Sequence, residues 1–156
     1  GGWQFHNCWF EAIEATDNTP DTLAIYATNP LDVLISNCRF TSLLTSPFST
    51  AAISLTHDMA IDNCRIENNE IFGAVGITIA TDVTHKWCDC IIKDNFIKAT
   101  TLCIDDNTDD WHIIGNNMIS LATKANATDL NVGLAVNNHL TGSDGTRLIP
   151  YTDQEA

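Results

Sequence analysis

The residue types best suited to acid–base chemistry gather in one short acidic stretch. It places four aspartates directly before a tryptophan and a histidine: Asp105, Asp106, Asp109, Asp110, Trp111 and His112. Carboxylates about 5 to 9 Å apart can divide the roles of acid and of base or nucleophile, and a nearby tryptophan can stack on a sugar ring. Aspartate is also a common turn former, so the same stretch fits a solvated turn. Both interpretations stay open, and the candidate catalytic residues are Asp106, Asp109 and Asp110.

Residues that could hold a metal are spread along the chain and do not share a ligand spacing. The five histidines occur singly, without an HxH or HExxH pattern. Cys88-Asp89-Cys90 is too tight for a usual zinc knuckle, and no CxxC occurs. We therefore expect no metal site and no cofactor.

Six cysteines permit a disulfide interpretation, but their surroundings favour free thiols. Cys8, Cys38 and Cys64 lie 30 and 26 residues apart, each inside an apolar pattern. Free cysteine is among the most buried residue types and packs as a small hydrophobe. We expect thiols in the core, which implies folding in a reducing compartment.

Seven basic and twenty acidic residues give the chain a net charge of −13. This field repels nucleic-acid phosphates and anionic membranes, so we expect neither as a partner. No apolar run approaches the eighteen or so residues that span a bilayer, so we expect no membrane insertion.

An internal repeat predicts the strands on which these residues would lie. Six segments align without gaps: FHNCWF at 5–10, ISNCRF at 35–40, IDNCRI at 61–66, IKDNFI at 92–97, IGNNMI at 114–119 and AVNNHL at 135–140. Their starts differ by 30, 26, 31, 22 and 21 residues. Short alternating runs of β-forming residues, separated by Asn, Asp, Thr and Gly, surround them. A unit of this length with two or three strands fits one coil of an all-β solenoid.

The middle of each segment has the chemistry of a stacked bend. The third column reads Asn7, Asn37, Asn63, Asp94, Asn116 and Asn137. The fourth column reads Cys8, Cys38, Cys64, Asn95, Asn117 and Asn138. Stacked strands put equivalent residues about 4.8 Å apart, and asparagine tolerates the left-handed conformation of a sharp bend. The first and sixth residues of each segment should point into the core.

The fifth residue of each segment should point outward. That column contains Trp9, Arg39, Arg65, Phe96, Met118 and His139. Aromatic residues, Met and Arg are enriched in interface cores, and exposed apolar stripes rarely stay bare. Trp9, Arg39, Arg65, Phe96 and Met118 therefore form a candidate interface, although a covering loop is an equally good explanation.

The alternating I-x-N-C-x-F and I-x-x-N-x-I segments resemble the right-handed parallel β-helix family of pectate lyases and phage tailspikes. The resemblance implies a single-stranded right-handed parallel β-helix of about six coils over residues 3–140, followed by a C-terminal cap or exit segment at 141–156. Because the chain begins inside a coil at Trp3, we expect further coils or another domain upstream.

The resemblance also implies two enzymatic options. Pectate lyases combine a calcium-binding aspartate cluster with a basic catalytic residue. Arg39 and Arg65 share a predicted column here, but no acidic cluster accompanies them. Related glycosidases use two or three carboxylates in a groove, for which the aspartates above and Glu67 and Glu70 provide material.

Three functional hypotheses follow. The first is a structural or receptor-contacting module of a bacteriophage particle of the tailspike, fibre or capsid-decorating type. Similar phage proteins are homotrimers, which implies a trimer that assembles in the bacterial cytoplasm and contacts other virion proteins or a host surface glycan. The second is a fragment of an enzyme, a glycosidase or lyase, that degrades bacterial polysaccharide. The third is a non-catalytic glycan-binding module in which Trp87 or Trp111 stacks on sugar.

Overall fold

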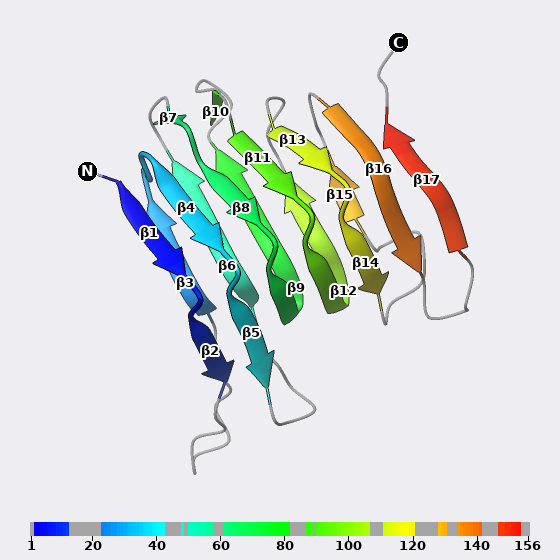
Figure 1. Cartoon of the computed structure of the whole chain (residues 1–156), viewed down its shortest axis with the longest axis horizontal. Coiled ribbons are helices and arrows are strands. Elements are labelled where there is room, and N and C mark those ends of the chain that lie inside the picture. The colour runs from blue at the N-terminus through cyan, green and yellow to red at the C-terminus, as the bar shows by residue number, and fades with distance from the viewer. Residues whose placement is uncertain are drawn as a thin grey trace.

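The regular elements are all β-strands in the part of the chain that the structure describes. The computed structural model describes residues 2–12, 23–42, 48, 50–57, 61–81, 87–88, 90–106, 111–120, 128–130, 134–141 and 147–153. Within these ranges the strands form one large sheet and one small sheet, and neighbouring strands are mostly parallel (Figure 1). The predicted all-β class with parallel strands is confirmed.

Three stacks of parallel strands make up the large sheet. The first stack contains, in spatial order, β1 (Trp3–His6), β4 (Val33–Ser36), β8 (Arg65–Glu67), β11 (Cys90–Lys93), β13 (Trp111–Ile114) and β16 (Leu134–Thr141). The second contains β2 (Trp9–Ala12), β5 (Arg39–Ser42), β9 (Glu70–Thr81), β12 (Phe96–Asp106), β14 (Asn117–Ser120) and the far end of β16. The third contains β3 (Leu23–Thr28), β6 (Ala51–His57), the second halves of β9 and β12, and β15 (Thr128–Leu130).

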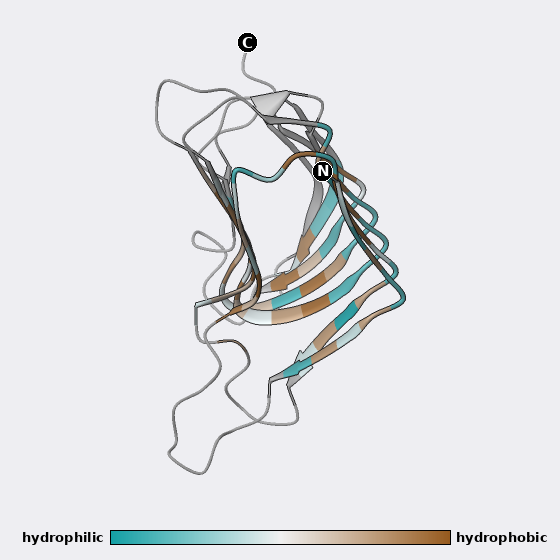
Figure 2. Cartoon of the chain, turned by 90° about the vertical axis from the view of Figure 1, so that its left-hand side faces the viewer, coloured by the Kyte–Doolittle hydropathy of each residue, from teal (hydrophilic) through white to brown (hydrophobic). Residues whose placement is uncertain are grey.

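In the described part of the chain, the stacks bend around a common interior, but the large sheet does not close on itself (Figure 2). Figure 2 also shows polar and apolar residues alternating along the strands, as strands with one buried face require. Three further strands lie outside the main pattern. β7 (Ile61–Asp62) pairs with β10 (Trp87–Cys88), and β17 (Arg147–Asp153) adds to β16 in the antiparallel direction.

Three inward columns of large apolar side chains fill the interior. The first consists of Phe5, Ile35, Ile66, Ile92 and Ile113, in register across the first stack. The second consists of Phe10, Phe40, Ile71, Ile97, Met118 and Leu140. The third consists of Ile25, Ile53, Ile77 and Ile104. Most of these side chains are completely buried, and each buried side chain of this size contributes about 1.5–3 kcal/mol of hydrophobic stabilisation.

A left-handed residue makes the bend between the first and second stacks. The bend residues are Asn7, Asn37, Asn68, Asp94, Gly115 and Asn137, and all have φ between 52° and 67°. Five of the six are Asn or Asp, the residues other than glycine that adopt this conformation most readily. The exception is Gly115, whose Cβ would meet the Asp94 Oδ1 at 2.8 Å.

The predicted alignment of the repeat is wrong at two of the six units. In the third unit, Ile66 and not Ile61 pairs with Ile35, so the unit is IENNEI at 66–71. Asn63 has a positive φ as well, but it forms a separate bend between β7 and β8, where its Nδ2 donates to the Asp32 Oδ1 at 3.0 Å. Both bends suit an asparagine, and therefore the two asparagine-containing segments look alike in sequence.

The fifth unit is displaced by one residue. Ile113 and not Ile114 pairs with Ile92, so Gly115 takes the bend and Asn116 follows it. An alignment that requires asparagine in the bend places Asn116 there. It misses Gly115, because glycine adopts the same left-handed conformation but has no side chain that resembles asparagine.

An asparagine column runs through the protein directly after the bends. It consists of Asn69, Asn95, Asn116 and Asn138, all of them buried. Each side-chain oxygen accepts a backbone N–H from the preceding unit at 2.8–3.0 Å: Cys38 N to Asn69, Asn69 N to Asn95, Asn95 N to Asn116 and Asn116 N to Asn138. Each Nδ2 donates to a carbonyl of the preceding unit: Ile35, Ile66, Ile92 and Ile113. The column thereby satisfies backbone groups that the bend removes from the strand ladders.

Cys8 and Cys38 occupy the equivalent position in the first two units, and we call them the cysteine pair. Cys38 is buried and its thiol donates to Phe5 O at 3.4 Å and to Ser36 O at 3.3 Å. The predicted burial of Cys38 and Cys64 is confirmed. Cys64 does not belong to this column, however, because it precedes β8 and not the bend after it.

Candidate interaction surface

The outward column of the second stack carries the most concentrated set of interaction-prone side chains among the described residues. Strand register places Trp9, Arg39, Glu70, Phe96, Asn117 and His139 in this column. Trp9 is 64% exposed and Phe96 is 38% exposed. The predicted outward positions of Trp9, Arg39 and Phe96 are confirmed.

Two residues of the predicted interface lie elsewhere. Met118 is fully buried in the second inward column, where it pairs with Ile97, so its predicted outward position is wrong. Arg65 is exposed but lies in the first stack beside Leu34 and Ile91, not next to Arg39. The error at Met118 comes from the fifth unit, because a strand displaced by one residue turns every side chain to the opposite face. The error at Arg65 comes from the third unit, which was assigned five residues too early and so placed Arg65 in the wrong stack.

Glu70 takes the place that had been predicted for Arg65. Its carboxylate lies 3.0 Å from the Arg39 Nε, and both side chains are about half exposed. The Arg39 guanidinium in turn lies 5.9 Å from the centre of the Trp9 ring. The Trp9 Nε1 donates to the Thr41 Oγ1 at 2.9 Å. These contacts hold three exposed side chains of adjacent strands in one fixed row.

The next outward column extends this row across the sheet. Phe72 and Lys98 pair in register, and the Lys98 Nζ lies 5.3 Å from the centre of the Phe72 ring. We call the combined set of Trp9, Arg39, Thr41, Glu70, Phe72, Phe96 and Lys98 the aromatic–charged surface. Cation–π contacts contribute about 0.5–1 kcal/mol at exposed sites, so they orient the side chains more than they stabilise the fold.

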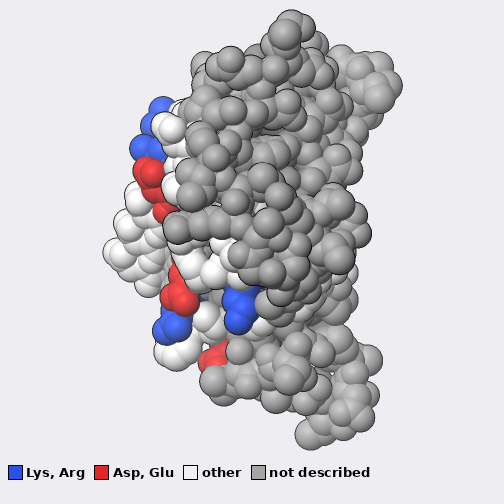
Figure 3. Space-filling model, turned by 90° about the vertical axis from the view of Figure 1, so that its right-hand side faces the viewer, with Lys and Arg blue, Asp and Glu red and all other residues white. Residues whose placement is uncertain are grey.

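The carboxylates Glu67 and Glu70 are both engaged by cations. Glu67 lies 3.4 Å from the Lys93 Nζ in the first stack, as Glu70 lies beside Arg39 in the second. Figure 3, which faces the right-hand end of the molecule in Figure 1, shows acidic and basic side chains next to each other along one edge of the described surface. Although the chain has a net charge of −13, each of these two glutamates lies beside a cation.

The predicted acidic catalytic cluster falls largely outside the described residues. Asp105 lies on β12 in register with Thr78 and Asp129, and it is half-buried. Asp106 ends β12, but its side chain lies outside the described part, as do Asp109 and Asp110 entirely. The same holds for the side chains of Trp87 on β10 and of Trp111 on β13. Their catalytic and glycan-binding roles stay predictions.

One serine–histidine contact has the geometry of a catalytic pair. The His6 Nδ1 lies 2.6 Å from the Ser36 Oγ. Ser36, however, is only 4% exposed between the flanking His6 and Glu67 of the neighbouring strands. The backbone N–H that follows Ser36, on Asn37, already donates to Glu67 O. The hydroxyl therefore lacks both an approach for substrate and a free neighbouring donor for an oxyanion.

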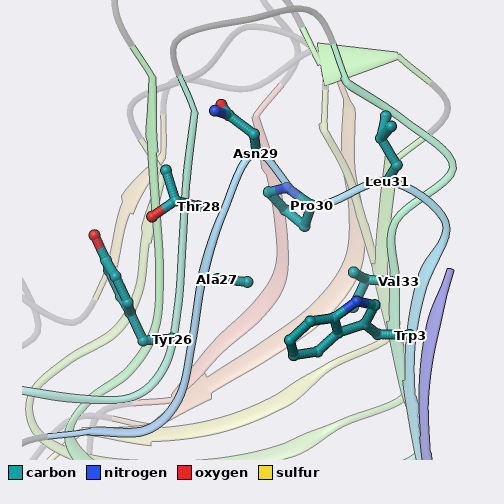
Figure 4. Close-up of a pocket in the computed structure, with 8 residues that line it drawn as sticks. All are labelled: Trp3, Tyr26, Ala27, Thr28, Asn29, Pro30, Leu31 and Val33. Carbon is teal, nitrogen blue, oxygen red and sulfur yellow. The ribbon is translucent and has the colours of Figure 1, made fainter. Parts of the chain in front are cut away.

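A pocket of about 260 Å³ opens at the end of the stacks formed by β1 and β3. Figure 4 shows Trp3, Ala27 and Val33 directed into the same space below Pro30. Trp3 is in register with the buried Val33 and so occupies an inward position, yet it is 62% exposed. Within the described chain β1, β2 and β3 are hydrogen-bonded on one side only, which leaves this end of the interior open.

Tyr26 lies on the outer side of the same end. Figure 4 shows it and Thr28 directed away from the pocket interior, on the opposite side of β3 from Ala27. Hydrogen bonds with the hydroxyls of Thr28 and Thr56 lower the pKa of the Tyr26 phenol. Tyr26 thus contributes to the rim of the pocket and also belongs to a row of hydroxyl groups on the outer side of β3.

The described residues also bear on metal binding and on membrane crossing. Among them, no group of three or more His, Cys, Asp and Glu side chains is arranged to hold a metal ion. Nor does this part of the chain contain a helix with the length and hydrophobicity that a membrane crossing needs.

No family model, no curated protein and no solved structure matches this chain. The geometry of the aromatic–charged surface is therefore the principal guide to function.

Proposed function

We propose that the chain is a right-handed parallel β-helix segment that serves as a structural and receptor-contacting module of a bacteriophage particle. In-register parallel stacks, a left-handed residue at each bend and a buried asparagine column support a coil-by-coil architecture. The sequence resemblance to phage tailspikes supports the assignment to a particle.

The single observation that carries the proposal is the aromatic–charged surface. Trp9 and Phe96 are exposed aromatic residues about 14 Å apart along the stack, at about 4.8 Å for each of three steps. Arg39 and Glu70 lie between them in the same column. Large rigid aromatics and arginine supply most of the binding energy at protein interfaces. A sheet with such a row is suited to a rigid macromolecular partner.

We assign this surface to contacts between copies of the chain in a homotrimer. Because Arg39 and Glu70 carry opposite charges, Arg39 of one subunit can pair with Glu70 of another. The same contact would bury the exposed aromatic side chains. The buried free thiols of Cys38, Cys64 and Cys103 suit assembly in the reducing cytoplasm of a bacterial host. The remaining outer surface would be left for other virion proteins or a host surface glycan.

Light scattering after size exclusion, over a hundredfold range of protein concentration, tests the trimer. We expect three times the monomer mass for the unaltered chain and the monomer mass for the double variant Trp9→Ser, Phe96→Ser. Tyr26→Ser removes an equally exposed aromatic from the third stack and should leave the trimer intact. A monomer at every concentration, or equal loss of trimer in the control, would reject this surface as the interface.

A second candidate function is glycan binding, which the open-end pocket favours. Trp3 offers an exposed indole face next to a concave space large enough for about one sugar unit. Binding of bacterial surface polysaccharides, measured by calorimetry with and without Trp3→Ala, tests this candidate. Release of reducing ends from the same polysaccharides, abolished by Asp109→Asn with Asp110→Asn, would instead support the enzymatic alternative.

A further inference from the structure

The cysteine pair places two thiols on adjacent parallel strands at one end of the molecule. Cys8 immediately precedes Trp9, which pairs in register with Arg39, and Cys38 immediately precedes Arg39. The Arg39 N–H donates to Cys8 O at 2.8 Å, so the two cysteine backbones are fixed side by side. Neighbouring strands lie about 4.8 Å apart, which is within the separation of about 4.4–6.8 Å that disulfide-linked Cα atoms adopt.

The two side chains occupy equivalent positions in adjacent units. The Cys38 thiol reaches back to the unit that contains Cys8, where it donates to Phe5 O. The Cys38 thiol donates to Phe5 O and Ser36 O, whereas the Cys8 thiol donates to His6 O at 3.4 Å. Both sulfur atoms therefore lie in the position that the asparagine column occupies in the later units. In that column, side chains of adjacent units touch at 2.9–3.0 Å.

The two thiols differ in how accessible they are. Cys38 is 2% exposed, while Cys8 is half-buried at the open end, where β2 has a strand on one side only in the described chain. Burial raises the pKa of the Cys38 thiol. A solution oxidant therefore meets Cys8 first, and Cys38 is held next to it as the second thiol.

We propose that Cys8 and Cys38 form an intramolecular disulfide when the protein leaves a reducing compartment and meets a low-molecular-weight disulfide such as oxidised glutathione. The Cys8 thiolate attacks one glutathione sulfur, forms a mixed disulfide and releases one reduced glutathione. The Cys38 thiolate then attacks the Cys8 sulfur and releases the second glutathione. Two protein thiols are oxidised and one glutathione disulfide is reduced to two thiols, which take up the two protons of the protein thiols, so no proton is released overall.

The bond would tie β2 to β5 across the first step of the second stack. It closes the chain between residues 8 and 38, which contains β2, β3 and β4, and so secures the open end of the interior. Loop closure of this length raises the melting temperature of a protein of this size by about 5–10 °C. The asparagine column cannot be modified in this way, so the cross-link is confined to the end without a stacked neighbour in the described chain.

Other described thiols are poorer substrates for the same oxidant. Cys103 is completely buried, and that burial raises its pKa to about 12. Cys64 is completely buried as well, and its thiol contacts Pro30 O at 3.7 Å. The reaction should therefore begin at Cys8.

The test is to incubate the full chain with oxidised glutathione at pH 8 and to map its disulfides by mass spectrometry after proteolysis without reduction. We expect one dominant linked peptide pair containing Cys8 and Cys38, and a melting temperature about 5–10 °C higher that reverts with dithiothreitol. In Cys8→Ser the linked pair and the thermal shift should both disappear.

Two outcomes would overturn the proposal. One is glutathione that stays attached to Cys8 without being displaced by Cys38 after prolonged incubation. The other is a dominant cross-link between different cysteines. Because both are read from the unaltered chain, the result does not depend on whether a cysteine variant folds.

Discussion

The first two units and the last four units use different side chains at the position directly after the bend. Directly after the bend, Asn69, Asn95, Asn116 and Asn138 each satisfy a backbone N–H and a backbone carbonyl of the preceding unit. At the equivalent position, the Cys38 thiol reaches Phe5 O but at 3.4 Å. A thiol is a weak donor and a weak acceptor, whereas an amide offers both strong groups.

The two kinds of side chain hold their units with different strength. Each asparagine in the interior of the column has partners on both sides, so these units are held in register by polar contacts as well as by apolar packing. The cysteine pair packs well but is less strongly bonded, and it lies at the end where Trp3 is exposed and a pocket opens. We therefore expect the protein to melt from the cysteine end.

The largest expected effect comes from deleting an interior member of the asparagine column. Asn116→Ala leaves the buried Ile92 O and Asn95 N without their present partners, and it removes one of the two acceptors of the Asn95 Nδ2. At about 1–3 kcal/mol for each orphaned group, partly relieved by relaxation, the free energy of unfolding should fall by about 3–5 kcal/mol. Urea denaturation followed by circular dichroism measures this change.

The neighbouring residue is the matched control. Asn117 is exposed on the outer surface and should tolerate alanine with a change of about 0.5 kcal/mol or less. Equal destabilisation by Asn116→Ala and Asn117→Ala would show that the column contributes nothing specific.

A reciprocal exchange of side chains sharpens the comparison between the two ends. Asn69→Cys should cost about 2 kcal/mol, because Cys38 N and Ile35 O lose strong partners. Cys38→Asn should be neutral or stabilise by about 1 kcal/mol, since an amide there can donate to Phe5 O more strongly than the thiol. Destabilisation by both exchanges would mean that packing, and not hydrogen bonding, decides which residue each unit uses.

A smaller effect is expected at the bend that uses glycine. Gly115→Ala combines a φ of +67° with a Cβ placed 2.8 Å from the Asp94 Oδ1, and should cost about 1–2 kcal/mol. Gly115→Asn should cost less, because asparagine holds this conformation in four other units. Thermal unfolding of both variants side by side tests the ranking, and a more stable alanine variant would contradict it.

The smallest expected effect concerns the exposed ion pair. A double-mutant cycle on Arg39→Ala and Glu70→Ala should give a coupling energy for folding below about 1 kcal/mol, since both side chains are about half exposed. The same variants should lower trimer formation if the surface is an interface. Strong coupling in folding together with an unchanged solution mass would make the pair a structural contact only.

Periodicity identified the strands well but could not set their register in every unit. The segments at 5–10, 35–40, 92–97 and 135–140 were aligned correctly, because each has an asparagine or aspartate in the bend and a cysteine or asparagine after it. The third and fifth units were aligned wrongly for local reasons. Asn63 forms a second, similar bend, and Gly115 replaces asparagine with a residue that shares its conformation but not its side chain.

The candidate surface was predicted in part for the same reason. Trp9, Arg39 and Phe96 belong to correctly aligned units, and the structure places them outward. Glu70, Phe72 and Lys98 were missed. The IENNEI segment at 66–71 contains the signal that would have found Glu70, since its two asparagines match the bend and the column.

The sequence by itself determined the all-β class, the repeating bend and the burial of its apolar positions, because these depend on local conformational preference and on strand periodicity. Only the tertiary structure decided which side chains meet across units, since those contacts depend on the register between strands about 20–30 residues apart. It replaced Arg65 by Glu70 beside Arg39 and moved Met118 into the core. A shift of one residue leaves hydrophobic composition unchanged but exchanges the inner face for the outer one.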